Sequence, residues 1–435
     1  GWPASDWWRA LGDAQLDALV AEGLQHNPGL EAADARLRLA QAEVGTARAE
    51  RLPSASVSGG YTGLRLPESM VGDELGGRYA GSSQAMVNFS YGVDLWGGKR
   101  ATWEAAVDTA HAAEVDARAA RLELSAGIVQ AYAALDHAWQ LQDVADDELQ
   151  RATRTLELTG QRRAAGIDSD LQVRQAQARI PAARQQQQAA ALQIEQARMA
   201  LAALLGQGPD RGLDIARPQA LQPLALQLPE VLPSGLLGRR PDIVAARWRV
   251  EAADRGIHAA KARFYPSFNI TALAGVVAPA VSDLLESNST FGYLGPALSL
   301  PLFDGGRLRA GLARSDAQYD AAVASYNQLV LQALQQVAEQ AATLRSLQQQ
   351  ALSQQDALET VQAAHDLAEQ RYRAGIGSYL EVLSVQEQLL QARQRMAGLH
   401  ARQLQAGVAL SQALGGGFVA DPPAGARAAT AVSAA

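Results

Sequence analysis

The chain has 435 residues with 38 basic and 45 acidic side chains, a formal net charge of −7 and no cysteine. This mild acidity excludes the basic surface typical of nucleic-acid-binding proteins, and the missing cysteines exclude disulfides and thiol chemistry. No run of about 18 apolar residues is present, so no transmembrane helix is expected. No signal peptide is visible at Gly1, so we expect a chain that has been processed or trimmed.

The first half of the chain returns about 210 residues later, a period far longer than the ~20–50 residues of solenoid repeats. NPGL at 27–30 matches RPDI at 240–243, LWGGK at 95–99 matches LFDGGR at 302–307, and GIDSDLQV at 166–173 matches GIGSYLEV at 375–382. We therefore expect two copies of a domain-sized unit. Repeat 1 covers 7–208, a linker covers 209–231, repeat 2 covers 232–417, and a disordered tail covers 418–435.

Short segments of alternating apolar and polar residues predict two strands in each repeat. They lie at about 54–63 and 84–95, and at about 267–277 and 291–302. Their length suits tilted strands that cross a membrane, for which about 9–11 residues suffice. An ordinary sheet packed on a soluble core is the alternative. Aromatic residues near the segment ends favour a membrane barrel with an aromatic girdle, and these are Tyr61, Tyr91, Trp96, Tyr265, Tyr293 and Phe303.

Proline placement predicts a long helical hairpin in each repeat. None of the 17 prolines falls between Pro67 and Pro181 or between Pro301 and Pro422, and a helix interior tolerates proline badly. The proline-free stretches are rich in good helix formers. We expect hairpins at about 100–205 and 308–414, each reversing at a Gly-Ile turn, because glycine accepts the left-handed conformation that ends a helix.

Four strands cannot close a barrel, since the smallest outer-membrane barrels have about 8 strands. An open edge is not tolerated in lipid, so copies of the chain must share one barrel. Two chains would give 8 strands with a filled interior, and three chains would give 12 with a lumen. The expected fold is thus mostly α with a membrane β-barrel part, in which long helices continue the barrel as a tunnel.

Several motifs resemble those of the outer-membrane efflux protein family, the TolC-like and OprM-like factors. They are LPSGLLGRRPDI at 232–243, FYPS at 264–267, LPLFDGG at 300–306, RYRAG at 371–375 and ALGGG at 413–417. WWRALGD at 7–13 and YGVDLWG at 91–97 are similar to the OprM-like branch. The resemblance covers the chain from about Trp7 to Phe418.

The resemblance implies a homotrimer in the Gram-negative outer membrane, with a 12-stranded barrel above an α-helical periplasmic tunnel. It also implies two partners, a periplasmic membrane fusion (adaptor) protein and an inner-membrane transporter of the RND class. Members of the OprM-like branch are often lipoproteins acylated on an N-terminal cysteine, which this sequence lacks. The sequence shows no nucleophile motif, phosphate loop or metal spacing, so we expect no enzyme, no metal and no cofactor.

The two Gly-Ile turns are the candidate periplasmic gate and docking surface. Three-fold symmetry would turn acidic residues there into rings that favour cations. The resemblance also points to a latch near the second turn, with arginine and tyrosine joining neighbouring helix pairs. Polar residues on a solvated tip are the alternative. The candidate gate residues are Asp168, Asp170, Tyr372, Arg373 and Glu381, and the candidate turn and docking residues are Gly166, Gly375 and Gly377.

The resemblance implies an outer-membrane channel of a tripartite efflux pump. Such a channel is a passive conduit that exports drugs or other small molecules from the periplasm to the exterior, and we expect it to be gated at the periplasmic helix turns. Two alternatives stay open. One is the outer-membrane component of a type I protein secretion system, which is built on the same plan. The other is a soluble periplasmic coiled-coil scaffold.

Overall fold

The computed structural model describes residues 2–72, 74, 76–77, 79–219, 221–224, 232–285 and 289–420. The helices and strands follow the order η1 (Trp7–Leu11), α1 (Ala14–His26), α2 (Pro28–Ala49), β1 (Ser54–Arg65), α3 (Glu68–Val71), β2 (Tyr79–Val93), α4 (Gly98–Ala164), α5 (Asp170–Leu204), η2 (Pro209–Asp214), α6 (Leu232–Arg239), α7 (Pro241–Ala262), β3 (Ser267–Ala278), η3 (Val281–Leu285), β4 (Thr290–Ser299), α8 (Arg307–Arg373) and α9 (Tyr379–Ala413).

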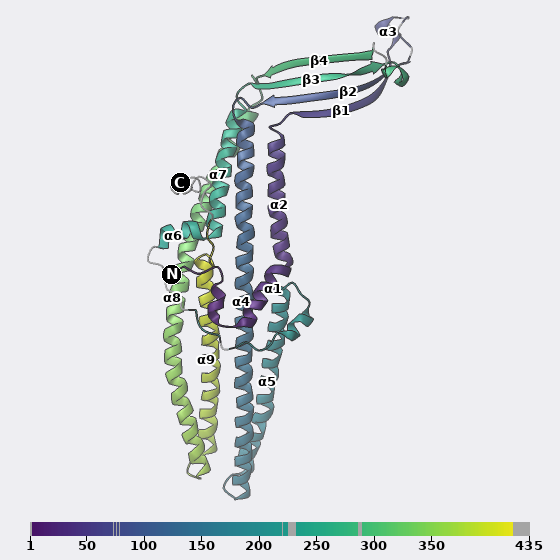
Figure 1. The fold of residues 1–435 in the computed structure, drawn as a ribbon. Helices are drawn as coiled ribbons and strands as arrows, with labels where there is room; N and C mark the ends of the chain where they lie inside the picture. The colour runs from purple at the N-terminus through teal and green to yellow at the C-terminus, as the bar shows by residue number, and fades with distance from the viewer. Residues whose placement is uncertain are drawn as a thin grey trace, which may run out of the picture. The chain divides into compact units, whose positions relative to one another are not determined.

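Matching helices in the two halves of the chain have equal lengths. Helices α4 and α8 have 67 residues each, α5 and α9 have 35 each, and α2 and α7 have 22 each. At ~1.5 Å per residue, each of the longest helices spans roughly 100 Å. Helix α4 turns back into α5, and α8 turns back into α9 (Figure 1). Each half of the chain therefore contains a long helical hairpin, and α5 continues through Pro181.

Within the described residues, four strands form one antiparallel sheet in the order β1-β2-β3-β4 (Figure 1). The register separates two faces. Val57 lies opposite Val87, which lies opposite Ala274, and this face is apolar. Asn88 lies opposite Ser56 on the other face and donates a hydrogen bond from Nδ2 to Ser58 Oγ (3.0 Å). Large apolar side chains of the first face are exposed, with Val57 79% and Leu294 74% accessible.

Two strands end slightly earlier than the alternation predicts, and in each case an aspartate between the strand and the next helix caps that helix. Strand β2 ends at Val93, and the Asp94 carboxylate accepts hydrogen bonds from the backbone N–H of Lys99 (3.1 Å) and Arg100 (2.7 Å). Strand β4 ends at Ser299, and Asp304 accepts from the N–H of Leu308 (2.8 Å). A carboxylate at a helix start satisfies orphan donors and favours the helix dipole.

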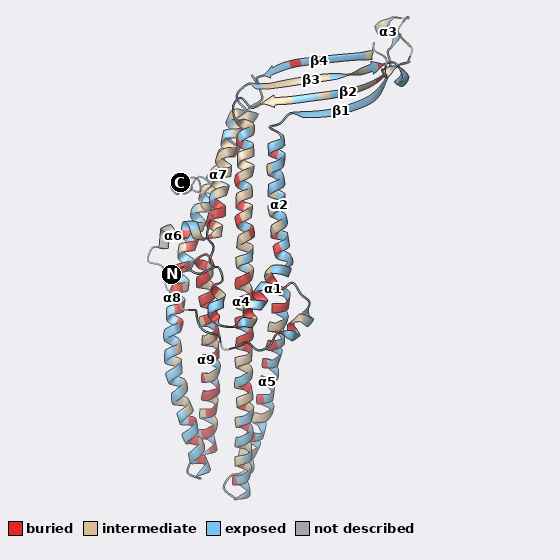
Figure 2. Cartoon of the chain, in the orientation of Figure 1, coloured by how far each residue is buried: buried red, intermediate tan, exposed pale blue. Residues whose placement is uncertain are grey.

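The main hydrophobic core lies where α1, the middle of α4, the end of α5 and the described part of the linker meet. Leu16, Ile128 and Leu201 are almost fully buried there, and Ile215 and Leu224 join them from the linker. Buried residues concentrate in these middle sections, whereas the sheet is mostly exposed (Figure 2). Most of the chain's stabilising apolar burial is thus placed in the helical part.

The chain divides into two compact units, and each contains segments of both repeats. The first comprises residues 1–34, 115–244 and 328–435 and holds the main core with both helical turns. The second comprises residues 35–114 and 245–327 and holds the sheet. Phe418 is buried, and residues 421–435 of the expected disordered tail lie outside the described residues.

Within the described part of the chain, no helix combines the length and the apolar character needed to cross a membrane.

Candidate gate at the helical turns

The two turns between the paired helices share one backbone conformation. Gly166 and Gly375 have φ values of +73° and +79°, which only glycine adopts without strain. In the first turn, Ile167 N donates to Arg162 O (2.9 Å), and in the second, Ile376 N donates to Arg371 O (3.0 Å). This pattern is the Schellman motif, which satisfies the last carbonyls of a helix. Both glycines are therefore required by the backbone.

The helix that follows each turn is capped by serine at equivalent positions. Ser378 Oγ accepts a hydrogen bond from Glu381 N, and Glu381 Oε2 accepts one from Ser378 N, both at 3.2 Å. In the first turn, Ser169 N donates to Gln172 Oε1 (2.5 Å). Such reciprocal capping boxes stabilise helix starts. Glu381 therefore has a structural role in its own protomer, and its side chain remains exposed.

A buried contact joins the first turn to the second hairpin. The Arg162 guanidinium binds Asp168 twice, from Nε to Oδ2 (2.9 Å) and from the second terminal nitrogen to Oδ1 (3.2 Å). Tyr372, near the end of α8, donates its hydroxyl hydrogen bond to Asp168 Oδ2. Arg162 also donates to the Tyr372 carbonyl and stacks 4.2 Å from the centre of its ring. We call Arg162, Asp168 and Tyr372 the latch.

The latch is almost fully shielded from water. The side chains of Arg162 and Asp168 are 8% and 3% exposed, and Tyr372 is fully buried. Burial raises the pKa of Asp168, but hydrogen bonds from Arg162 and Tyr372 outweigh it, so the net direction is down. Burial and the bond to Asp168 raise the pKa of Tyr372 to about 12. Asp168 is therefore a carboxylate and Tyr372 a neutral phenol at neutral pH.

Tyr372 is held in an apolar cluster at the tips of the hairpins. Its ring lies 6.1 Å from that of Tyr379, and the cluster is completed by Ala176, Ala368 and Val382. Thr159 Oγ1 lies 3.1 Å from the Tyr372 hydroxyl. The Tyr379 hydroxyl is buried without a hydrogen-bond partner within the described protomer. Residues of both hairpins thus fix the tyrosine in position.

The other predicted gate residues lie outside this contact. Asp170 is exposed and pairs with Arg163, 2.5 Å from Nε to Oδ1. Arg373 pairs with Glu369 on its own helix, so within the protomer it ties no two hairpins together. A Cβ at Gly377 would approach the backbone N of Tyr372 to 3.0 Å, which explains a small residue there. Asp168 does not face solvent as a ring charge would, because its carboxylate is buried and paired.

Arg162 is the latch residue that the sequence analysis missed. It occupies the position in repeat 1 that Arg371 occupies in repeat 2. The motif RYRAG at 371–375 indicated candidate residues in repeat 2 alone. Applying the repeat shift to Arg371 would have pointed to Arg162, six residues before Asp168. The contact between the two hairpins determines that Tyr372 binds Arg162 and not Arg373, and local sequence does not show this contact.

A second polar contact lies farther along the same hairpins. The Glu148 side chain on α4 is 3% exposed and accepts hydrogen bonds from Arg179 on α5 (3.0 Å) and from Gln386 on α9 (3.3 Å). Arg179 also binds Glu387 Oε2 (3.2 Å). A buried carboxylate requires such partners. Glu148 therefore ties the first hairpin to α9, as the latch ties it to α8.

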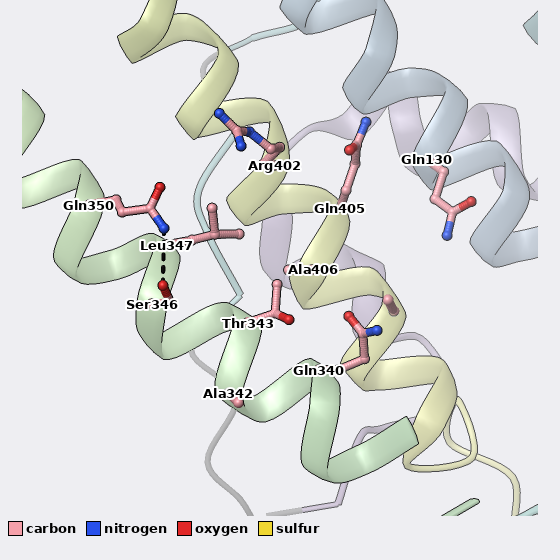
Figure 3. A pocket seen from close by; sticks show the side chains of 11 residues that line it. Gln130, Gln340, Ala342, Thr343, Ser346, Leu347, Gln350, Arg402, Gln405 and Ala406 are labelled. Carbon is pink, nitrogen blue, oxygen red and sulfur yellow. Dashed lines mark hydrogen bonds between the residues drawn. The ribbon is translucent and has the colours of Figure 1, made fainter. Parts of the chain in front are cut away.

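A groove with a cavity volume of about 770 Å³ runs along α8 and α9 and reaches Gln130 of α4. Figure 3 shows that amides and small side chains line it, with Gln340, Thr343 and Ser346 on α8 and Gln405 and Ala406 on α9. This lining offers neutral hydrogen-bonding groups, with Arg402 as its ionisable side chain.

The aromatic residues predicted for the sheet fall into two groups. Trp96 and Tyr265 stack with ring centres 4.7 Å apart, and Phe303 is 93% exposed. Tyr61 and Tyr91 lie on the apolar face of the sheet, as their register with Ser83 and Ile270 shows. Tyr293 lies opposite Leu273, which lies opposite Asn88, so it shares the face of Asn88 and not that of Tyr61 and Tyr91. Its place in an aromatic girdle stays a prediction.

Known proteins match both the sequence and the fold. The family described as outer membrane efflux protein matches residues 19–207 and 232–416. Fusaric acid resistance protein FusA of Burkholderia cepacia is 40% identical over 324 residues, which are 73% of this chain and 61% of FusA. Multidrug resistance outer membrane protein MdtP of Escherichia coli is 31% identical, with 97% of this chain and 88% of MdtP covered.

Among solved structures, the outer membrane protein VceC of Vibrio cholerae superposes with a TM-score of 0.88. Its sequence identity is 36%, and the match covers 96% of this chain and all of VceC. The arrangement of paired helical hairpins and a four-stranded sheet is therefore an architecture already seen in outer-membrane proteins.

Proposed function

This chain belongs to the outer membrane efflux protein family, and from that premise we propose that three copies form a passive export conduit whose periplasmic entrance is gated at the helical turns. The protein is an outer-membrane efflux channel with a TolC-like fold. The fold and family are those of channel proteins and not of enzymes. The proposal concerns the oligomer, the gate and the cargo.

The edges of the sheet support the proposed trimer. Within the described residues, β1 and β4 each pair on one side only, and in lipid an unpaired edge leaves backbone groups without partners. Joining β4 of one protomer to β1 of the next closes the sheet. Three protomers give 12 strands and a water-filled lumen, whereas two would give a barrel filled by side chains. The exposed apolar face then meets lipid, and the face with Asn88 lines the lumen.

The gate rests on one observation, the buried contact of Asp168 with Arg162 and Tyr372. It joins two hairpins of one protomer at their turns, and an entrance formed by three such pairs widens when the hairpins separate. A charge-assisted hydrogen bond in a buried site is among the stronger polar contacts in proteins. The latch therefore favours the closed entrance, and the capping boxes keep the turns rigid in both states.

The test is single-channel recording in planar bilayers. Tyr372→Phe keeps the ring in its cluster but removes the hydroxyl that binds Asp168, a loss of about 1–2 kcal/mol. The ratio of open to closed entrance should rise roughly tenfold, seen as higher mean conductance. Tyr326→Phe, on the same helix, is the matched control and should conduct as the wild type. Unchanged conductance in Tyr372→Phe, or an equal rise in the control, contradicts the latch.

We further propose that the conduit works in a tripartite pump with a periplasmic adaptor protein and an inner-membrane transporter of the RND class, which supplies the energy. The relatives are proteins of fusaric acid resistance and multidrug resistance, which supports small organic molecules as cargo. Deleting the gene should lower the resistance of the host to such compounds several-fold. Unchanged resistance with loss of a secreted protein would favour type I secretion instead.

A further inference from the structure

A cavity with a volume of about 300 Å³ lies where the sheet meets the helices, between the start of α4 and the end of α7. The residues that line it all lie within the compact unit that holds the sheet, and they include Trp96, Arg100, Glu104, Arg255, Lys261 and Tyr265. Neither the latch nor the lumen face of the strands includes any of these residues.

The lining of this cavity carries more positive than negative charge. Three cations, Arg100, Arg255 and Lys261, face one carboxylate, Glu104. Glu104 is bound by Arg100 (2.8 Å) and Arg255 (3.3 Å). Lys261 has no ion-pair partner among the residues that the structure describes. The cavity therefore offers cations to an anion of roughly phosphate size.

Neighbouring acidic groups leave this excess in place. Asp108 lies 3.8 Å from Arg255 Nε, and His258 faces Asp254 at 3.6 Å on its own helix. The carboxylate of Asp94 accepts two backbone N–H bonds at the start of α4. Glu104 and Asp108 thus share Arg255, and the three cations of the lining still outnumber these two carboxylates.

One wall of the cavity is aromatic and partly exposed. Trp96 follows β2, and Tyr265 precedes β3. Their rings stack at 4.7 Å, and Trp96 Nε1 donates to Pro266 O (2.7 Å). Both rings are about half exposed, at 51% and 52%. Tryptophan and tyrosine of this kind are enriched where a membrane protein crosses from hydrocarbon to headgroups.

Exposed apolar side chains follow the ends of β2 and β4. Leu302 and Phe303 follow β4 and are 90% and 93% exposed, and Leu95 precedes Trp96 and is 58% exposed. Three large apolar side chains exposed at the same end of the sheet indicate an interaction surface, and acyl chains would cover them. Cations on the helices and apolar groups on the strand ends together match the two parts of an anionic amphiphile.

We propose that this cavity binds the phosphate headgroup of an anionic phospholipid in the periplasmic leaflet of the outer membrane. Arg100, Arg255 and Lys261 contact the phosphate, the Trp96–Tyr265 pair lies at the headgroup level, and the acyl chains lie along Leu302 and Phe303. The inference rests on the barrel of the proposed function, but not on the gate.

The experiment is native mass spectrometry of the detergent-solubilised protein titrated with phosphatidylglycerol or with phosphatidylcholine. The wild type should bind the anionic lipid more tightly. The double variant Arg100→Gln with Lys261→Gln removes two cations and leaves Arg255 to hold Glu104. Its apparent Kd for phosphatidylglycerol should rise about tenfold, because each basic residue near a membrane surface adds substantially to anionic lipid binding.

The control variant Arg184→Gln with Arg395→Gln removes the same charge from exposed sites on the helical hairpins and should leave the Kd unchanged. Lys261→Arg, which keeps the cation, should also bind normally. An equal loss in the control, or equal binding of both lipids, overturns the proposal. Displacement of the lipid by millimolar glycerol phosphate would mean a site for free phosphate and would also overturn it. Gate conductance is unaffected in the double variant, which separates this site from the latch.

Discussion

The turn at Gly166 and the turn at Gly375 have the same hydrogen-bonded backbone, but their side chains differ in what they contribute. The first places Asp168 where the second has Gly377, and it uses Arg162 where the second has the exposed Arg371. The second turn contributes Tyr372 and Tyr379 to the apolar cluster. A duplicated backbone has thus been kept, while its two copies supply complementary halves of one buried contact.

This difference shows that a repeat can preserve geometry without preserving chemistry. The glycines and serines are the same in both turns, because the Schellman motif and the capping box demand them. The acid, the arginine and the tyrosine are free to differ, since the backbone does not depend on them. Substitutions at equivalent positions of the two turns therefore separate backbone effects from effects of the latch.

The largest expected difference is between Arg162→Ala and Arg371→Ala. Removing Arg162 leaves the buried Asp168 carboxylate without its cation, which should destabilise the contact between the hairpins by about 3–5 kcal/mol. Arg371 is exposed and makes one 3.4 Å bond to Ile376 O, so its loss should cost under ~0.5 kcal/mol. Hydrogen exchange of the amides at the two turns measures both. Equal hydrogen-exchange protection of the turn amides in the two variants would contradict the different roles of Arg162 and Arg371.

Replacing either turn glycine with valine should destabilise the protein strongly and to a similar extent. Gly166→Val and Gly375→Val each force a β-branched residue to a positive φ, at a cost of about 1–3 kcal/mol. Little crowding adds to this, because a Cβ at Gly166 meets nothing within 4 Å and one at Gly375 meets only an Arg162 terminal nitrogen at 3.9 Å. Thermal unfolding of the two variants should shift alike. A much larger shift in one of them would mean that its backbone has a role the other lacks.

The latch should respond to pH only at the extremes. The lowered pKa of Asp168 contributes stability that is complete above its unfolded value, near 3.8, and is lost as pH falls through the still lower folded pKa. The raised pKa of Tyr372 contributes below its unfolded value of 10.0, and this is lost as pH rises through about 12. Conductance should thus be flat near neutrality and rise below pH 3.8, and Asp168→Asn should abolish that rise. A midpoint near pH 6 would implicate a histidine instead.

The smallest effect on stability is expected for Glu381→Gln. Gln172 already takes this position in the first capping box, so the free energy of unfolding should change by under ~0.5 kcal/mol. If the three copies of Glu381 form a ring at the entrance, cation selectivity should nevertheless fall, because such rings attract cations. The reversal potential under a salt gradient measures this. An unchanged potential would leave Glu381 as a cap only.

Local patterns predicted most of the architecture but not the chemistry of the site. Proline-free stretches located α4 and α8, and alternation located the strands, because both depend on neighbouring residues. Strands β2 and β4 end at Val93 and Ser299, slightly before the alternation predicts, and Asp94 and Asp304 cap the helices that follow. The burial of Asp168 and its pairing with Arg162 arise from the approach of two hairpins. Nothing in the sequence around Asp168 distinguishes a buried acid from one on a solvated tip.

The two unpaired edges of the sheet have a consequence for how the protein is made. A single copy that entered the bilayer first would expose the backbone groups of β1 and β4 to hydrocarbon, so we expect membrane insertion and subunit joining to be one event. Under the proposed trimer, each chain would have to meet two others in the periplasm before it inserts. A variant that assembles but cannot open should accordingly be dominant negative, because it would block channels that also contain normal subunits. Co-expression of the variant with the wild type should reveal this effect.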